Sequence, residues 1–338
     1  MPESMPLGAV SSWQPSASLD VTIRLRSGVD HIDTALVRAL QADGRAGHLA
    51  LAKRVGLSRA ATAVRVERLL DTGVIRVVGV VHPYVLGLRG LAHLSLIVDG
   101  PTRPVAEQIA RLDVTPFVSI VSGAYAIITE LRVADMTALL GAVSAIRDIP
   151  GVRSLNTLTY VELVKDVLSP AGVPTVEVDS LDVRLLGLLQ DDGRLSYVAL
   201  AERLGVSAAS ARTRLLRLID GGVVHVGALV RRTATDREVA AGLGVTAAGT
   251  DEHLVTELAA LPEVEFLART TGRFDIVATV RGSSNAELAR TLDRVRALRD
   301  ASSVETWAHL EVIKESYDYQ VAPAQRRSGG RRAVTSAS

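Results

Sequence analysis

Hydrophobic residues recur at two different periods along this chain. Within residues 30–79 and again within 179–228, apolar residues return every three or four positions, which predicts amphipathic helices. Within 80–168 and 229–318, short apolar or alternating runs between turn-forming residues predict strands, with helices among them. An α+β fold with two helical and two mixed domains follows.

The second half of the chain repeats the first. Landmarks recur 149 positions later without a gap, among them Asp33 with Asp182 and Gly123 with Gly272. A repeat of this length is a whole module. The expected boundaries are an arm at 1–29, a helical domain at 30–79, a mixed domain at 80–168, a linker at 169–178, a helical domain at 179–228, a mixed domain at 229–318 and a basic tail at 319–338. We expect the arm and the tail to be disordered.

Each helical domain is predicted to hold three helices. In the first copy, Asp30 stands where a carboxylate caps the first helix, Gly56 suits the left-handed end of the second, and Ser58 caps the third. The second copy has the same residue types at the equivalent positions. Two short helices joined by a tight glycine-containing turn indicate a helix-turn-helix, whose last helix is the candidate reader of DNA. The extended chain after Gly73 predicts a short wing or a connecting strand.

Small residues and arginines share the outer face of the third helix. Small side chains let the backbone approach DNA bases, and arginines read guanine edges or hold phosphates. The candidate DNA-binding residues are Ser58, Arg59, Ala60, Ala63, Val64, Arg65 and Arg68, and Ser207, Ala208, Ala209, Arg212, Thr213, Arg214 and Arg217. Residues 45–76 contain seven basic residues, Arg45 among them, and two acidic ones. Residues 194–225 contain five basic residues, Arg194 among them, and two acidic ones. An ordinary solvated helix face and a three-helix protein-binding domain stay open as alternatives.

The mixed domains have matching element orders. Strands are predicted at 93–98, 117–121, 125–132 and 155–165, with helices at 105–112 and 136–146. In the second copy, strands are predicted at 239–246, 266–271, 274–281 and 304–314, with helices at 252–261 and 286–298. This β-α-β-β-α-β order is the ferredoxin-like plan. Because residues 240–245 are rich in glycine, we expect that strand to be weak.

Composition excludes several kinds of site. The chain has no cysteine, so disulfides, thiolate metal sites and a cysteine nucleophile are ruled out. Its seven histidines are far apart, which gives no support for a metal site, and no cofactor is expected. No apolar run approaches the length that spans a bilayer. We expect a cytoplasmic protein with no membrane partner.

The chain resembles the leucine-responsive regulator/AsnC family of transcription factors. The residues that carry the resemblance are Leu51-Ala52-Lys53-Arg54-Val55-Gly56-Leu57-Ser58, Arg65-Val66-Glu67-Arg68-Leu69 and Gly73-Val74-Ile75 with their second-copy equivalents, and Leu261-Pro262-Glu263-Val264 before Thr271-Gly272-Arg273-Phe274-Asp275. The resemblance covers about residues 30–166 and 179–315. It implies winged-helix or helix-turn-helix DNA-binding domains, ferredoxin-like ligand-sensing domains whose sheets pair, and a homo-oligomer.

The resemblance also places the effector pocket near the turn between the second and third strands of the sensing domain. The candidate effector-binding residues are Thr271, Gly272, Arg273, Phe274 and Asp275, with Gly123 and Tyr125 of the first copy. Ala126 stands where the second copy has Asp275, so ligand sensing is expected to be stronger in the second copy or absent from the first. Alternatively, Asp275 only stabilises its own turn.

These observations predict a transcriptional regulator and not an enzyme. Its partners would be double-stranded DNA and an amino acid or related small metabolite. Ala63, Val64 and Glu67 differ from their equivalents Arg212, Thr213 and Leu216, which predicts an asymmetric operator. Two other functions stay open. One is a siroheme-decarboxylase-like enzyme on the same fold, although the histidine- and tyrosine-rich segment expected near the sensing turn is missing. The other is a ligand-sensing oligomer that acts through protein partners.

Overall fold

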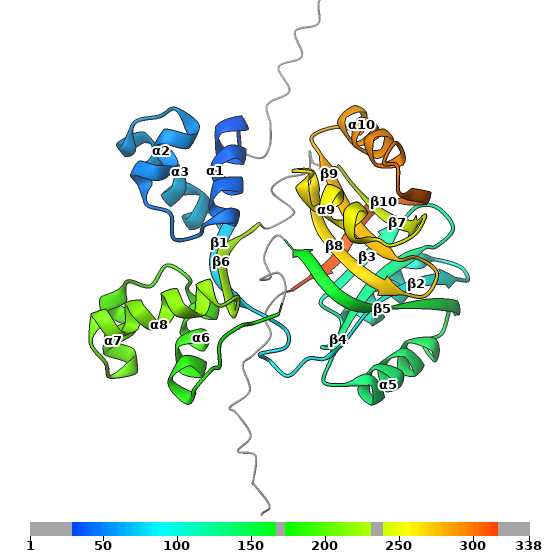
Figure 1. Cartoon of the computed structure of the whole chain (residues 1–338), viewed down its shortest axis with the longest axis horizontal. Helices are drawn as coiled ribbons and strands as arrows, with labels where there is room; N and C mark the ends of the chain where they lie inside the picture. The colour runs from blue at the N-terminus through cyan, green and yellow to red at the C-terminus, as the bar shows by residue number, and fades with distance from the viewer. Residues whose placement is uncertain (1–28, 167–172, 231–238, 317–338) are drawn as a thin grey trace, which may run out of the picture.

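The computed structural model describes residues 29–166, 173–230 and 239–316 of the 338-residue chain (Figure 1). The first repeat contains α1 (His31–Ala42), α2 (His48–Val55), α3 (Arg59–Asp71), β1 (Ile75–Val81), β2 (Gly90–Val98), α4 (Thr102–Ala110), β3 (Phe117–Val121), β4 (Ile127–Val133), α5 (Met136–Arg147) and β5 (Val152–Asp166). The second contains α6 (Ser180–Asp191), α7 (Tyr197–Leu204), α8 (Ala208–Asp220), β6 (Val224–Val230), β7 (Val239–Ala247), α9 (Glu252–Ala260), β8 (Val264–Thr271), β9 (Ile276–Gly282), α10 (Asn285–Arg296) and β10 (Ala301–Glu315).

Element order is the same in the two repeats, and most predicted elements differ from the observed ones by a few residues at their ends. The expected basic tail, nearly all of the N-terminal arm and the first part of the linker fall outside the described residues. Among the helices of the described part, none is both long and apolar enough to cross a bilayer.

We call α1–α3 head 1 and α6–α8 head 2. The strand that follows each head pairs with the strand that follows the other, so that β1 and β6 form a two-stranded antiparallel ribbon between the heads (Figure 1). Val226 and Ala228 of β6 belong to the hydrophobic core of head 1, and Val81 of β1 belongs to that of head 2. Of the two possibilities expected after each head, a short wing or a connecting strand, the structure has a single strand whose partner comes from the other repeat.

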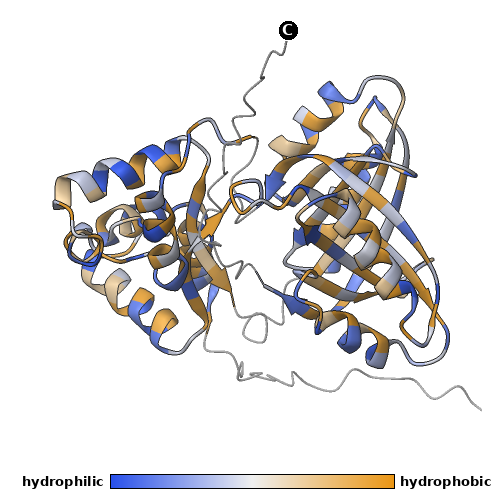
Figure 2. Cartoon of the chain, turned by 90° about the horizontal axis from the view of Figure 1, so that it is seen from below, coloured by the Kyte–Doolittle hydropathy of each residue, from blue (hydrophilic) through white to orange (hydrophobic). Residues whose placement is uncertain are grey.

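The other eight strands close into one barrel in the order β10-β3-β4-β2-β5-β8-β9-β7. The two repeats share both seams, because β5 pairs with β8 and β10 pairs with β3. Apolar faces of α4, α5, α9 and α10 pack on the outside of the strands, and the helices in Figure 2 are striped with hydrophobic and hydrophilic residues accordingly. The two mixed domains therefore pair within one chain.

The glycine-rich strand β7 is not weakly paired, contrary to expectation. It pairs with β9 on one side and β10 on the other. A Cβ added at Gly242 would lie 2.0 Å from the Trp307 ring, and one at Gly244 would lie 2.3 Å from the Phe274 ring. The two aromatic side chains therefore occupy the space that the glycines leave. Sequence reasoning missed this because the large side chains lie on distant segments.

Two lysines at the ends of the long strands bind across the repeats. Lys165, near the end of β5, donates through Nζ to the carbonyl oxygens of Ala259 and Leu261, each at 3.0 Å, at the end of α9 in the other repeat. Lys314, its equivalent on β10, donates to the carbonyl of Leu112 after α4 at 2.8 Å. A cation at a helix C-terminus satisfies free carbonyls and favours the helix dipole. The repeated lysines thus fasten each repeat to a helix of the other.

Replacing Lys165 by methionine keeps an unbranched apolar chain and removes the charge and both hydrogen bonds. Because Lys165 is partly exposed, we expect the free energy of unfolding to fall by about 1–2 kcal/mol. Urea unfolding followed by circular dichroism measures this. Lys53→Met is the matched control, since Lys53 is exposed on α2, and it should cost less than about 0.5 kcal/mol. Equal losses in the two variants would contradict the cross-repeat cap.

Candidate nucleic-acid interface and effector turn

The helix-turn-helix geometry is formed in the same way in both heads. The second helix ends at a left-handed glycine, Gly56 with φ 69° in head 1 and Gly205 with φ 73° in head 2. Ser58 then caps α3 by accepting the Ala61 amide at 3.2 Å, and Ser207 caps α8 through an equivalent bond. These are the caps and stops that the sequence predicts. They place α3 and α8 at matching positions in the two heads.

Most candidate DNA-binding residues lie at the surface of α3 and α8. In head 1, Ser58, Arg59, Ala60, Val64 and Arg68 are exposed, while Ala63 and Arg65 are half-buried. In head 2, Ser207, Ala209, Arg212, Thr213 and Arg217 are exposed, while Ala208 and Arg214 are half-buried. The opposite side of α3, with Thr62, Val66 and Leu69, is buried as predicted. The predicted face of each third helix is therefore exposed to solvent in both heads.

Four of the candidate arginines have partners within their own head. In head 1, the fully buried carboxylate of Asp33 accepts from Arg65 at 2.9 Å and from Arg68 at 2.5 Å, and Arg65 also binds Asp30 at 2.7 Å. The same Asp30 and Asp33 form a capping box at the start of α1. These contacts tie the third helix to the first, because a buried carboxylate needs paired donors.

The arrangement is repeated in head 2. Asp182, also fully buried, accepts from Arg214 at 2.8 Å and from Arg217, and Arg214 binds Asp179 at 2.7 Å. The amide of Asp182 foremost, and then the guanidinium of Arg214, hold the pKa of Asp179 below its usual value, against the opposing effect of burial. The sequence indicates a cap at Asp179 and a repeated position at Asp182, but not their bonds to the arginines. Arg59 and Arg212 lie outside this arrangement, exposed at the surface.

The candidate effector turn is held by its own carboxylate. Gly272 has φ 130°, and Asp275 accepts the amide of Ala247 through Oδ2 at 2.8 Å. The Asp275 amide in turn donates to the Val245 carbonyl at 3.1 Å. One carboxylate oxygen thus fastens the turn to the end of β7. This contact is expected if Asp275 stabilises its own turn. A role of Asp275 in effector binding stays a prediction.

The turns of the two repeats meet. Arg273 donates to the hydroxyl oxygen of Tyr125 at 2.7 Å, and its guanidinium lies 5.9 Å from the centre of the Tyr125 ring and 5.1 Å from that of Phe274. Arg273 also pairs with Glu305, and Asn156 donates to the same hydroxyl at 2.6 Å. The structure therefore brings Tyr125 of the first repeat to the candidate effector turn of the second. Their 148-residue separation gave no geometric signal.

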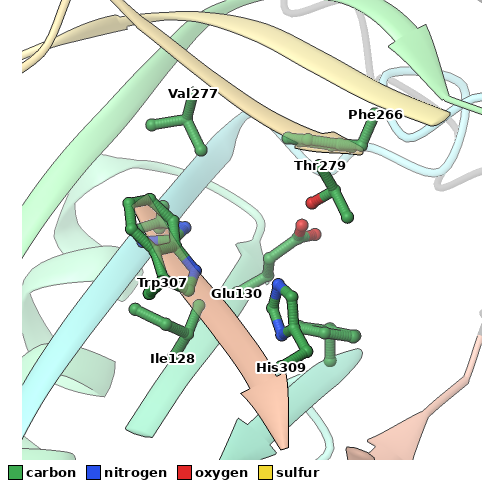
Figure 3. A pocket seen from close by; sticks show the side chains of 9 residues that line it. Ile128, Glu130, Phe266, Val277, Thr279, Trp307 and His309 are labelled. Carbon is green, nitrogen blue, oxygen red and sulfur yellow. The ribbon is translucent and has the colours of Figure 1, made fainter. Parts of the chain in front are cut away.

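A second polar cluster lies inside the barrel, and sequence reasoning missed it. Figure 3 shows Glu130, Thr279, Trp307 and His309 around one small cavity, which has room for about one water molecule. The first repeat supplies His93 and Glu130 to its lining, where the second repeat has Gly242 and Thr279. The only available signal was polar residues at inward positions of predicted strands.

Burial controls the ionisation of this cluster. It lowers the pKa of His93 to about 4 and raises the pKa of Glu130, whose neighbour Arg132 acts in the opposite direction. Burial first, and then the charge of Glu130, raise the pKa of the Tyr160 hydroxyl well above its usual value. His93 Nε2 lies 3.1 Å from the Ser95 hydroxyl. His93 is therefore neutral at physiological pH and packs inside the barrel as an uncharged group.

This makes stability depend on pH in a defined window. His93 stays unprotonated in the folded barrel until about pH 4, whereas in the unfolded chain it takes up a proton near pH 6.5. The stability that it confers is therefore complete above about pH 6.5 and declines as the pH falls towards 4, by about 3 kcal/mol. We expect the difference in unfolding free energy between wild type and His93→Gln to shift by that amount between pH 8 and pH 4 in urea titrations. A constant difference would contradict the burial of a neutral histidine.

Comparisons with known proteins agree with the helical and mixed domains. The AsnC-type helix-turn-helix domain matches residues 29–70 and 178–219, and the Lrp/AsnC ligand binding domain matches residues 244–319. An uncharacterized HTH-type transcriptional regulator of Pyrococcus horikoshii is 34% identical over 145 residues, which are 42% of this chain and 92% of that protein. A proline dehydrogenase transcriptional activator of Rhizobium radiobacter is 28% identical over 148 residues, 42% of this chain and 95% of that protein.

Among solved structures, a siroheme decarboxylase in complex with an iron-uroporphyrin III analogue matches 84% of this chain and 93% of its own, with a TM-score of 0.55. At 16% identity this likeness concerns the fold alone. The regulators, in contrast, are matched over nearly their whole length by less than half of this chain. With two AsnC-type heads and a relative matched at 34% identity, the chain belongs to the Lrp/AsnC family of transcriptional regulators.

Proposed function

We propose that this protein is a sequence-specific DNA-binding regulator that carries two non-identical reading heads in one chain. The observation that carries the proposal is the pair of AsnC-type heads joined by the β1–β6 ribbon, with α3 and α8 exposed. Helix-turn-helix pairs read two sites about one helical turn apart, near 34 Å. A homodimer of single modules obtains its two heads from two chains, whereas both heads here belong to one polypeptide. The domain boundaries predicted from the sequence are part of this proposal.

In each head, some residues are proposed to contact DNA phosphates and others to contact bases. Three residues of each head are proposed to contact DNA phosphates: Ser58, Arg59 and Arg68 in head 1, and Ser207, Ala208 and Arg217 in head 2. Arg65 and Arg214 hold the third helix against the first through Asp30 and Asp179. Ala60, Ala63 and Val64 are proposed to face bases in head 1, and Ala209, Arg212 and Thr213 in head 2. An arginine reads guanine through two hydrogen bonds, whereas alanine and valine offer only apolar contact, for example with a thymine methyl. The two half-sites should therefore differ in sequence.

The effector is proposed to be an amino acid or a related small metabolite. It would bind near Thr271, Gly272, Arg273, Phe274 and Asp275, with Gly123 and Tyr125 nearby. The support is the Lrp/AsnC ligand binding domain match and the meeting of the two turns through Arg273 and Tyr125. Arg273 offers a guanidinium to a ligand carboxylate, in competition with Glu305. Further association into homo-oligomers is also part of the proposal.

An enzyme on the same fold is the second candidate, because a siroheme decarboxylase resembles 84% of the chain in structure. One observation favours the regulator: the relatives with higher identity are regulators. Incubation of the purified protein with siroheme, followed by measurement of carbon dioxide release, separates the two functions, and release would overturn the regulator.

The reading role of Arg212 can be tested on DNA selected from genomic fragments by the purified protein. Because a bidentate arginine–guanine contact contributes about 1–3 kcal/mol, Arg212→Ala should weaken binding about 5- to 150-fold and relax base preference in one half-site only. Fluorescence anisotropy with base-substituted duplexes measures both effects. Arg290→Ala, which removes an exposed arginine from α10 on the barrel, is the matched control and should retain wild-type affinity.

Two results would contradict the proposal. Unchanged affinity after Arg212→Ala would favour a protein that acts through other proteins. Identical footprints of the two heads over a perfect inverted repeat would contradict asymmetric reading.

A further inference from the structure

The turns that follow the first helix of each head interlock. Arg45, in the turn after α1, donates through Nη1 to the carbonyl of Gly193 at 2.6 Å and through Nη2 to that of Leu195 at 2.9 Å, in the turn after α6. Arg194, its equivalent, donates to the carbonyl of Gly44 at 2.9 Å. Each arginine therefore reaches out of its own head and binds the backbone of the other. The sequence placed both among the cations available to DNA phosphates, and the structure gives them this different position.

The same turns are pressed against the ribbon. The Gly44 amide donates to the carbonyl of Val226 at 2.8 Å, and the Gly193 amide donates to that of Val77 at 2.9 Å. A Cβ added at Gly44 would lie 2.9 Å from the Val226 carbonyl oxygen, and one at Gly193 would lie 2.9 Å from the carbonyl carbon of Val78. The backbone of each turn therefore packs directly against the ribbon, with no room for a side chain. Glycine is needed here for close approach.

The interlock is not symmetric. Arg45 stacks 5.0 Å from the centre of the Tyr197 ring, and the residue equivalent to Tyr197 in head 1 is His48. Arg194 has a single hydrogen bond to the opposite head, and burial, followed by the charge of Arg45, lowers its pKa. Arg45 therefore makes more of the contact, with two hydrogen bonds and an aromatic face.

A two-stranded ribbon is a weak joint when nothing else supports it. Each strand of this ribbon also packs into the core of the opposite head, but a twist of the ribbon would still change the separation of α3 from α8. Contacts between the turns, which lie outside the strands, oppose that twist because they join each head to the other at further points. The two reading helices are then held at one separation and one relative rotation.

We infer that Arg45 and Arg194 are positioning residues that fix the spacing between the two DNA half-sites. The inference rests on the proposed function, since it concerns how the two heads read DNA together. It assigns to the arginines a role in selecting operator geometry, which is distinct from contact with bases or phosphates. A fixed pair of heads accepts one spacing, whereas a loosened pair accepts several with similar affinity.

The test uses a selected genomic fragment whose two half-sites have been mapped, and duplexes in which the segment between them is lengthened by one to five base pairs. Five added base pairs rotate one half-site by about half a helical turn. Wild type should bind that duplex at least about tenfold more weakly than the natural one. In Arg45→Ala/Arg194→Ala the ratio should fall below about threefold, with Arg45→Ala alone having more effect than Arg194→Ala.

Two further variants separate positioning from binding and folding. Arg59→Ala/Arg212→Ala should weaken binding at every spacing and keep the wild-type ratio. Arg45→Lys keeps the charge with fewer donors, so it should reduce the ratio partly, and it carries the test if the double alanine variant does not fold by circular dichroism. A ratio unchanged in the arginine variants would overturn the inference. Failure of wild type to bind any fragment would instead overturn the proposed function.

Discussion

Main-chain hydrogen bonds between the two repeats are the interaction on which the rest of the structure depends. They join β1 to β6 between the heads, and β5 to β8 and β10 to β3 around the barrel. Without them each mixed domain would expose two strand edges, which favour association with other chains. Pairing within one polypeptide removes these edges. It also places the two heads next to each other and brings the candidate effector turns of the two repeats into contact.

Because the two repeats belong to one chain, equivalent positions in the two repeats can hold different residues. The barrel interior shows the result most clearly. The first repeat places His93 there, whereas the second has Gly242, whose space is filled by Trp307. At the candidate effector turn, Arg273 of the second repeat donates a hydrogen bond to Tyr125 of the first. A symmetric homodimer carries the same side chain at both equivalent positions, so it could not combine a histidine in one copy with a glycine in the other.

Local features were predictable from the sequence because short-range chemistry determines them. The capping aspartates, the left-handed Gly56 and the serine cap at Ser58 depend on neighbours within a few residues. The repeat then doubled the evidence for each element.

Features made by distant residues were not predictable in the same way. The buried Asp33 gave no sign of its bonds to Arg65 and Arg68, because the partners lie more than 30 residues away. The count of basic residues in each helical domain also overstated the number of cations that face away from the protein. Arg45 and Arg194 contributed to it, yet they bind the backbone of the opposite head. The outward face of the third helix was predicted from helix geometry alone, and the exposure of most of its residues agrees with that prediction.

The central claim is that the strand exchange occurs within a single chain, and the absence of cysteine from the sequence allows a direct measurement. Arg76 of β1 and Leu229 of β6 are directly paired in the ribbon. After mild oxidation, Arg76→Cys/Leu229→Cys should form a disulfide that leaves the chain at its monomer mass of 35.8 kDa on a non-reducing gel. An equal mixture of the two single-cysteine variants should form no cross-link between them. A covalent dimer of the double variant, or efficient cross-linking in the mixture, would contradict the account.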